Sequence, residues 1–248
     1  RYAQSPAFEV LLFAYSLDGG PVQVLDLTET GGVLPDIVTN YLLDPNIVKH
    51  AYNAPFEWFC LSQHLNLPEA GRMAWLGQWR CTMLHGMYCG YPAGLDAAGK
   101  ALGLPQDKEK LSTGKALIKY FCVPCAPTKT NGGRTRNLPH HDTDKWQLFK
   151  EYNAQDVVTE MEIERRLSRF PVPDFIWKQW RTDQIINSRG VAVDLELMNG
   201  ALYLDDLTRK QYLQEAQEIT GLENPNSLSQ LAVWLRDETG REINSLTK

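Results

Sequence analysis

The chain has 248 residues, of which 43% are hydrophobic, and a formal net charge of −5. This length provides a sizeable core for one large domain, or for one domain and part of another. The sequence contains no apolar run long enough to span a bilayer and no charged-then-apolar leader, and its acidic balance excludes polyanion binding through overall charge. The five cysteines are expected to be reduced thiols, as in a cytoplasmic protein.

The first elements expected in chain order are β-strands. Phe8–Tyr15 is apolar and rich in β-forming residues, and Val22–Leu27 alternates between apolar and polar positions. The residues between them, Asp18–Pro21, are typical of a tight turn, so the pair predicts a hairpin. Ile47–Tyr52 is a third expected strand.

Helices are expected to dominate the rest of the first 140 residues. One helix is expected to begin at Asn53, a residue type that favours the N-cap position, and to run to about Leu65. Pro55 is tolerated in the first turn of this helix. Val123–Pro139 is a loop by its proline and glycine content. Further helices are expected around Thr82–Tyr91, Leu95–Leu102 and Thr113–Phe121.

The strongest helical pattern is Asp142–Phe170, which a Pro-rich joint, Phe170–Phe175, follows. The joint predicts a domain boundary near residue 170. Helices are then expected at Ile176–Ser188, Leu195–Glu218 and Ser227–Glu238. Strands that lead and helices that follow predict an α/β domain with a helical segment after it.

Two of the expected helices each carry a polar pair. Asn53 and Glu57 are four residues apart, and so are Tyr152 and Asp156, so both members of each pair share one helix face. A solvated helix face explains either pair alone. Both helices are otherwise expected to face the core, however, so the two pairs are candidates to face each other across a cleft.

Carboxylates that meet in a cleft repel each other and stay ionised when cations lie between them. Hard oxygen ligands without His or Cys favour Mg²⁺ or Mn²⁺ over zinc. Two such ions are a standard device for cleaving a phosphodiester, and a Tyr hydroxyl beside them can orient the attacking water.

At these residues the chain resembles a known family. "NAPFE" and "YNAQDVVTE" resemble the second and third motifs of DnaQ-like 3'–5' proofreading exonucleases. The subtype is the tyrosine one, because Tyr152 lies four before Asp156, whereas Glu151 stands where the other subtype has His. "FEVLLFAYSLDGGPVQVLDL", "YFCVPCAPTKTNGGRTRNLP" and "RGVAVDLELM" resemble, in order, phage-type and bacterial family A DNA polymerases.

The resemblance implies a fold and a division of the chain. Residues 1–170 are expected to form a ribonuclease-H-like mixed sheet flanked by helices, and residues 171–248 the helical start of the polymerase region on its thumb side. Implied partners are DNA, as a single-stranded 3' end on a primer–template, and the rest of the polymerase chain. No membrane is implied.

The resemblance also implies residue roles. Asp156 is expected to bind a Mg²⁺ or Mn²⁺ ion of a two-ion site, and Tyr152 to position the attacking water. Glu57 stands in place of the second-motif Asp, so its contact with the metal is either direct or through water. Asn53 is expected near the 3'-terminal nucleotide.

The family's first motif, a D-x-E on the first strand, is not found in its expected place. The chain is therefore expected to begin downstream of it, with weak metal affinity, little nuclease activity alone and a sheet that lacks a central strand. The D-x-E at Asp194–Glu196 follows the third motif, so Asp194 is expected to cap the next helix instead.

Two weaker signals lie between the motifs. A Gly-containing loop without acidic residues carries Lys129, Arg134 and Arg136. These side chains are expected either to contact phosphate groups of a nucleic acid or to belong to an ordinary solvated loop. Cys122 and Cys125 are expected to be structural thiols, because a second C-x-x-C is absent.

The expected function is removal of mismatched 3'-terminal nucleotides as nucleoside monophosphates. The main alternative is a catalytically inert domain that holds DNA or braces the polymerase. A stand-alone ribonuclease of the same fold is a third interpretation, which the resemblance beyond residue 187 weakens.

Overall fold

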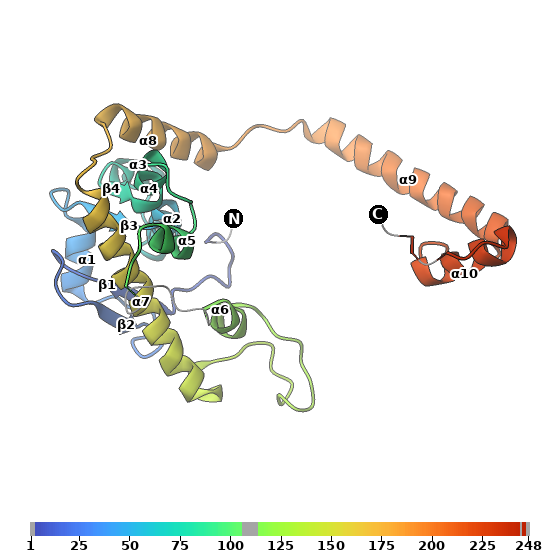
Figure 1. The fold of residues 1–248 in the computed structure, drawn as a ribbon, viewed down its shortest axis with the longest axis horizontal. Coiled ribbons are helices and arrows are strands. Elements are labelled where there is room, and N and C mark those ends of the chain that lie inside the picture. Colours follow the sequence, from blue (N-terminus) through green and yellow to red (C-terminus); the bar gives the residue numbers. More distant parts are fainter. Residues whose placement is uncertain (1–2, 106–113, 244, 247–248) are drawn as a thin grey trace. The chain divides into compact units, whose positions relative to one another are not determined.

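The computed structural model describes residues 3–105, 114–243 and 245–246 and divides into two compact units, Arg1–Arg189 and Gly190–Lys248 (Figure 1). Helix α8 (Asp174–Arg189) belongs to the first unit, beyond the proline-rich joint. The functional boundary expected near residue 170 stays a prediction, since compactness alone does not assign function.

The predicted hairpin is confirmed. Strands β1 (Leu12–Tyr15) and β2 (Gln23–Asp26) pair antiparallel, with Leu12 opposite Asp26 and Tyr15 opposite Gln23. In the turn, Asp18 and Gly19 have φ values of 49° and 76°, the left-handed region that Asp tolerates and Gly adopts freely.

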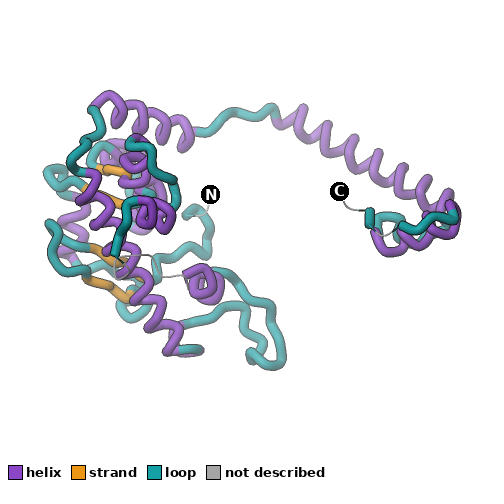
Figure 2. The backbone as a smooth tube through the Cα atoms, viewed as in Figure 1, coloured by secondary structure: helices purple, strands orange, loops and turns teal. Residues whose placement is uncertain are grey.

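The second sheet pairs β3 (Lys49–Ala51) with β4 (Trp79–Cys81) in parallel. The Lys49 ammonium is buried and donates to the carbonyls of Asp44 and Ile47, at 2.7 Å each, and to the Gln78 side chain, which fixes the start of β3. In the described part of the chain the two sheets are not hydrogen-bonded to each other. The α/β class is therefore confirmed, as two small sheets among many helices (Figure 2).

Helices cover both sheets. In the first unit, α7 packs against β1, β2, α4, α5 and α6, and α2 packs against β3 and β4. The sequence interpretation missed β4 and the eight-residue helices α1 and α3. The helices of this unit are α1 (Asp36–Leu43), α2 (Ala54–His64), α3 (Glu69–Leu76), α4 (Thr82–Tyr88), α5 (Leu95–Ala101), α6 (Gly114–Cys122), α7 (Thr143–Leu167) and α8, with a 3₁₀ turn at Pro139–His141. Thr113, the first residue of one expected helix, lies outside the described residues.

The core of the first unit is rich in tryptophan. Trp58, Trp75 and Trp79 are each at most 3% exposed and join α2, α3 and β4 in one cluster, which Trp180 of α8 completes. Trp146 packs with Phe149 in a second cluster between α6 and α7. These aromatic side chains therefore supply much of the core of the first unit.

The second unit consists of α9 (Leu195–Thr220) and α10 (Leu228–Thr239). The Asp194 side chain accepts hydrogen bonds from the backbone N–H groups of Glu196 and Leu197, so the N-cap predicted there is confirmed and the D-x-E has a structural use. Among the described residues, no helix combines the length and the apolar character that crossing a membrane requires.

Candidate active site

Glu57 lies in the first turn of α2, among aromatic neighbours. Its Oε2 atom is buried and accepts no hydrogen bond from the residues that the structure describes. The pKa of Glu57 is raised to about 7, mainly by burial and to a smaller extent by the charges of Glu160 and Asp156, although a hydrogen bond from its own backbone N–H opposes this shift. The carboxyl groups of Glu57 on α2 and of Asp156 and Glu160 on α7 therefore lie near enough for their charges to act on Glu57, and we call these three residues the carboxylate cluster.

Glu160 is a member of this cluster that the sequence interpretation missed. It lies one helical turn after Asp156 on α7 and is 7% exposed. Thr82 Oγ1 of α4 donates a hydrogen bond of 2.5 Å to Glu160 Oε1. Burial raises the pKa of Glu160 to about 7, although the Thr82 hydroxyl opposes this shift. The signal in the sequence was its spacing of four from Asp156.

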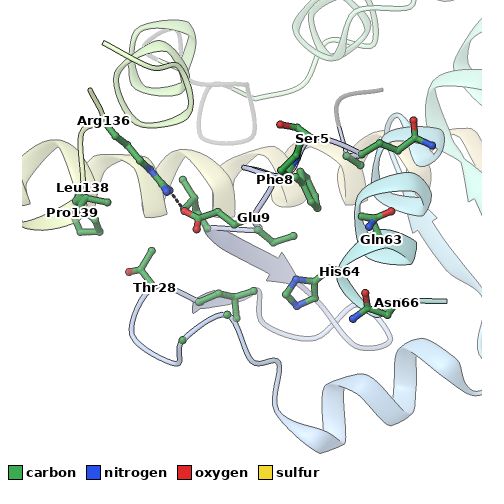
Figure 3. A pocket seen from close by; sticks show the side chains of 18 of the residues that line it. Ser5, Phe8, Glu9, Thr28, Gln63, His64, Asn66, Arg136, Leu138 and Pro139 are labelled. Atoms are coloured by element: carbon green, nitrogen blue, oxygen red, sulfur yellow. Dashed lines mark ion pairs between the residues drawn. The ribbon is translucent and has the colours of Figure 1, made fainter. Parts of the chain in front are cut away.

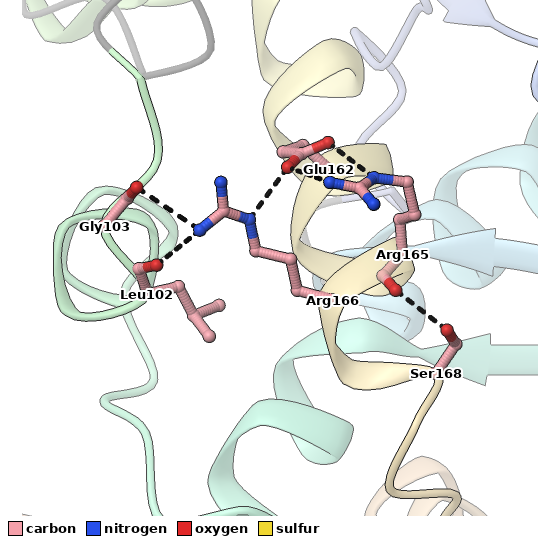
Figure 4. A network of polar contacts seen from close by, with 6 residues as sticks. All are labelled: Leu102, Gly103, Glu162, Arg165, Arg166 and Ser168. Atoms are coloured by element: carbon pink, nitrogen blue, oxygen red, sulfur yellow. Dashed lines mark hydrogen bonds and ion pairs between the residues drawn. The ribbon is translucent and has the colours of Figure 1, made fainter.

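The carboxyl-terminal half of α7 is anchored to α5 by a polar network (Figure 4). Glu162 accepts hydrogen bonds from Arg165 and Arg166, which lower its pKa to about 2. The Arg166 guanidinium also donates to the Leu102 carbonyl at 2.6 Å and to the Gly103 carbonyl at 3.3 Å. This network holds the helix that carries Asp156 and Glu160.

Tyr152 is buried in the core between α6 and α7. Its ring stacks on Phe149, with 6.3 Å between ring centroids, and it is 6% exposed. A Cβ atom added to Gly114 would lie 2.1 Å from Cε2 of the Tyr152 ring, so α6 approaches this ring closely. The ring is thus held one turn before Asp156 by packing on both sides.

Replacing Gly114 by Ala is expected to displace the Tyr152 ring. Overpacking of this kind typically costs about 1–3 kcal/mol, because the ring must leave its rotamer or α6 must move. Urea denaturation should show a lower free energy of unfolding for Gly114→Ala. Gly90→Ala is no suitable control because of its positive φ, whereas Gly94→Ala adds a Cβ at an ordinary 3.7 Å from its nearest neighbour. Equal losses in Gly114→Ala and Gly94→Ala would contradict the contact.

Asn53 occupies the predicted N-cap position of α2 and is exposed. Its side chain makes no capping hydrogen bond, so the amide is not committed to the helix end. Asn53 thus lies one helical turn before Glu57, at the exposed start of α2.

The basic loop is organised by Asn131 rather than by its charges. The Asn131 amide accepts from the N–H groups of Thr128 and Gly133 and donates to the Ala126 carbonyl. Arg134 Nε donates to Asn137 Oδ1 at 2.8 Å, while Lys129 is exposed. Of the charges predicted to contact phosphate, Arg134 thus has a partner within the loop.

Arg136 forms an ion pair with Glu9, across an open cavity of about 920 Å³ (Figure 3). The segment Ala3–Leu11, the end of α2 at Gln63 and His64, and the residues around Pro139 line this cavity. The exposed His140 also lies there, in the polar turn that precedes α7.

The chemistry of the cluster suits a hard cation better than zinc. Glu57 and Asp156 supply oxygen atoms only, and the buried Glu57 Oε2 lacks a donor among the described residues. Within that part of the chain, no group of three or more His, Cys, Asp or Glu side chains could hold a metal by itself. All five cysteines are free thiols.

Comparison with known proteins gives one clear similarity. The chain is 46% identical over 247 residues to the DNA polymerase of Bacillus phage SP02, in a match that covers 100% of this chain and 37% of that polymerase. No family model matches the chain. No solved structure matches it either. The chain thus resembles, from end to end, a segment of little more than a third of a phage DNA polymerase.

Proposed function

We propose that the chain is a segment of a phage-type family A DNA polymerase. Residues 1–170 are its 3'–5' proofreading exonuclease domain, of the DnaQ-like tyrosine subtype, and residues 171–248 begin its polymerase region. The observation that carries this proposal is the 46% identity to the DNA polymerase of phage SP02 over the whole chain. A phage polymerase acts on DNA, so a primer–template and its 3' end are the proposed partners.

The carboxylate cluster supports the exonuclease part of the proposal. Glu57 and Asp156, carboxyl groups from separate helices that each have one buried oxygen atom, act on each other electrostatically, and a cation would compensate both. They would hold Mg²⁺ or Mn²⁺ together with the two carboxylates of a D-x-E motif on a further strand. Such a strand between β1 and β3 would also join the two separate sheets into one mixed, ribonuclease-H-like sheet.

Each of the other site residues has a proposed role. Bound divalent ions activate water and stabilise the leaving oxygen in phosphodiester hydrolysis. Tyr152, held by Phe149 and Gly114, positions that water. Asn53, whose amide is free of capping, binds near the 3'-terminal nucleotide, and Lys129 is the most exposed candidate for phosphate contact.

An inert DNA-holding or bracing domain is the second candidate function. It is favoured by the lack of a three-ligand metal group in the described residues, and by the ion pair that occupies Arg136. Under this interpretation Glu57 and Asp156 bind no cation and take no part in catalysis.

A nuclease assay on the full-length protein separates the two candidates. A primer with a mismatched 3'-terminal nucleotide and no nucleoside triphosphates is incubated with Mg²⁺, and the products are resolved by length. Shortening from the 3' end, with release of nucleoside monophosphates and inhibition by a chelator, is the expected result. If the protein binds mismatched and matched primers with equal affinity but shortens neither, the inert domain is established instead.

A further inference from the structure

Thr82 and Glu160 connect two helices inside the carboxylate cluster. Thr82 is the first residue of α4, directly after β4, and Glu160 lies in the middle of α7. Their side chains are 2% and 7% exposed, and the hydroxyl-to-carboxylate bond is 2.5 Å long. The bond therefore fixes the start of α4 against α7 at a site that water does not reach.

The position of Glu160 on α7 directs its charge at the other two carboxylates. Residues four apart on a helix lie on the same face, so Glu160 lies directly beside Asp156 along α7. Glu57, on α2, experiences the charges of both. Its buried Oε2, without a donor among the described residues, gives the cluster an acceptor that a ligand could satisfy.

A purely structural link would not need a carboxylate at position 160. A Gln side chain could accept the Thr82 hydrogen bond without burying a third acidic group beside two others, which is costly unless a positive charge compensates it. All three carboxylates can be ionised together without this cost when a cation is bound.

We propose that Glu160 is a positioning residue of the divalent-cation site, which Thr82 holds in place and whose charge strengthens cation binding at Glu57 and Asp156. In this proposal Glu160 acts through its charge, with its Oε1 atom held by Thr82, while Glu57 and Asp156 are the ligands of the ion. This inference rests on the proposed exonuclease function, because it presupposes that a cation binds the pair.

Binding of Mn²⁺ alone to the full-length protein tests the proposal, with free Mn²⁺ measured by electron paramagnetic resonance. The Mn²⁺-binding sites that are lost in Glu57→Gln are those that belong to the carboxylate cluster. Glu160→Gln is expected to weaken those same sites by about 10- to 100-fold, the usual effect of a residue that supports metal ligands. Glu164→Gln removes the same charge one turn further along α7 and is expected to change binding less than about threefold.

Thr82 variants keep the test decisive if Glu160→Gln does not fold. Thr82→Val removes the hydroxyl and should weaken Mn²⁺ binding, whereas Thr82→Ser keeps the hydroxyl and should bind as the unaltered protein does. If Glu57→Gln loses the Mn²⁺ sites but Glu160→Gln or Thr82→Val binds Mn²⁺ as the unaltered protein does, the proposal is overturned. If Glu57→Gln also binds normally, the proposed cation site itself is wrong.

Discussion

Asp156→Asn in the full-length protein is expected to slow removal of a mismatched 3'-terminal nucleotide by on the order of 10³-fold. The reason is that the substitution replaces a proposed metal ligand by a neutral amide, and cation stabilisation of the leaving oxygen contributes several kcal/mol to such a reaction, at 1.36 kcal/mol per factor of ten. Extension of a correctly paired primer should be unchanged. Single-turnover rates on mismatched and matched primers measure both effects.

Asp144→Asn provides the matched control for this experiment. Asp144 lies on the same helix in its first turn, is exposed, and undergoes the identical chemical change. It should remove mismatched nucleotides at the unaltered rate. Retention of full nuclease activity by Asp156→Asn would show that the carboxylate cluster is not the catalytic centre, whatever its electrostatics.

Local patterns were sufficient to predict the hairpin and helix α7. The Asp18–Gly19 turn and the start of α7 after Asp142 both depend on residues adjacent in sequence, and both were predicted from the local pattern. Strand β4 was missed because its three residues are too few to show alternation. Helices α1 and α3, of eight residues each, are too short to establish a helical period against chance.

The missed parts of the site depend on contacts between distant residues. Glu160 stands in a run with several charged neighbours, a pattern typical of a solvated helix face, and only its contact with Thr82 shows that it is buried. The ion pair of Arg136 with Glu9 likewise joins segments that no sequence spacing relates. Glu57 was singled out from sequence because it interrupts a local apolar run, which is itself a local signal.

The electrostatic cost of the cluster predicts an unusual pH dependence of stability for the metal-free chain. Burial raises the pKa of Glu57 from 4.5 to about 7, so the folded state keeps a proton that the unfolded state releases above pH 4.5. Stability from this group is therefore highest at low pH, falls as the pH rises from about 4.5, and is lost above about 7. At about 1.4 kcal/mol per pH unit, the cost at pH 8 is about 3–4 kcal/mol.

Glu57→Gln is accordingly expected to make the metal-free chain more stable by about 3–4 kcal/mol at pH 8, and to change its stability little at pH 4.5. Urea unfolding followed by tryptophan fluorescence measures this difference, since six of the seven tryptophans lie in residues 1–189. The exposed Glu151 offers the control Glu151→Gln, which should leave stability unchanged at both pH values. A Glu57→Gln protein that is less stable at pH 8 would mean that the ionised carboxylate is stabilised within the fold, and the need for a compensating cation would disappear.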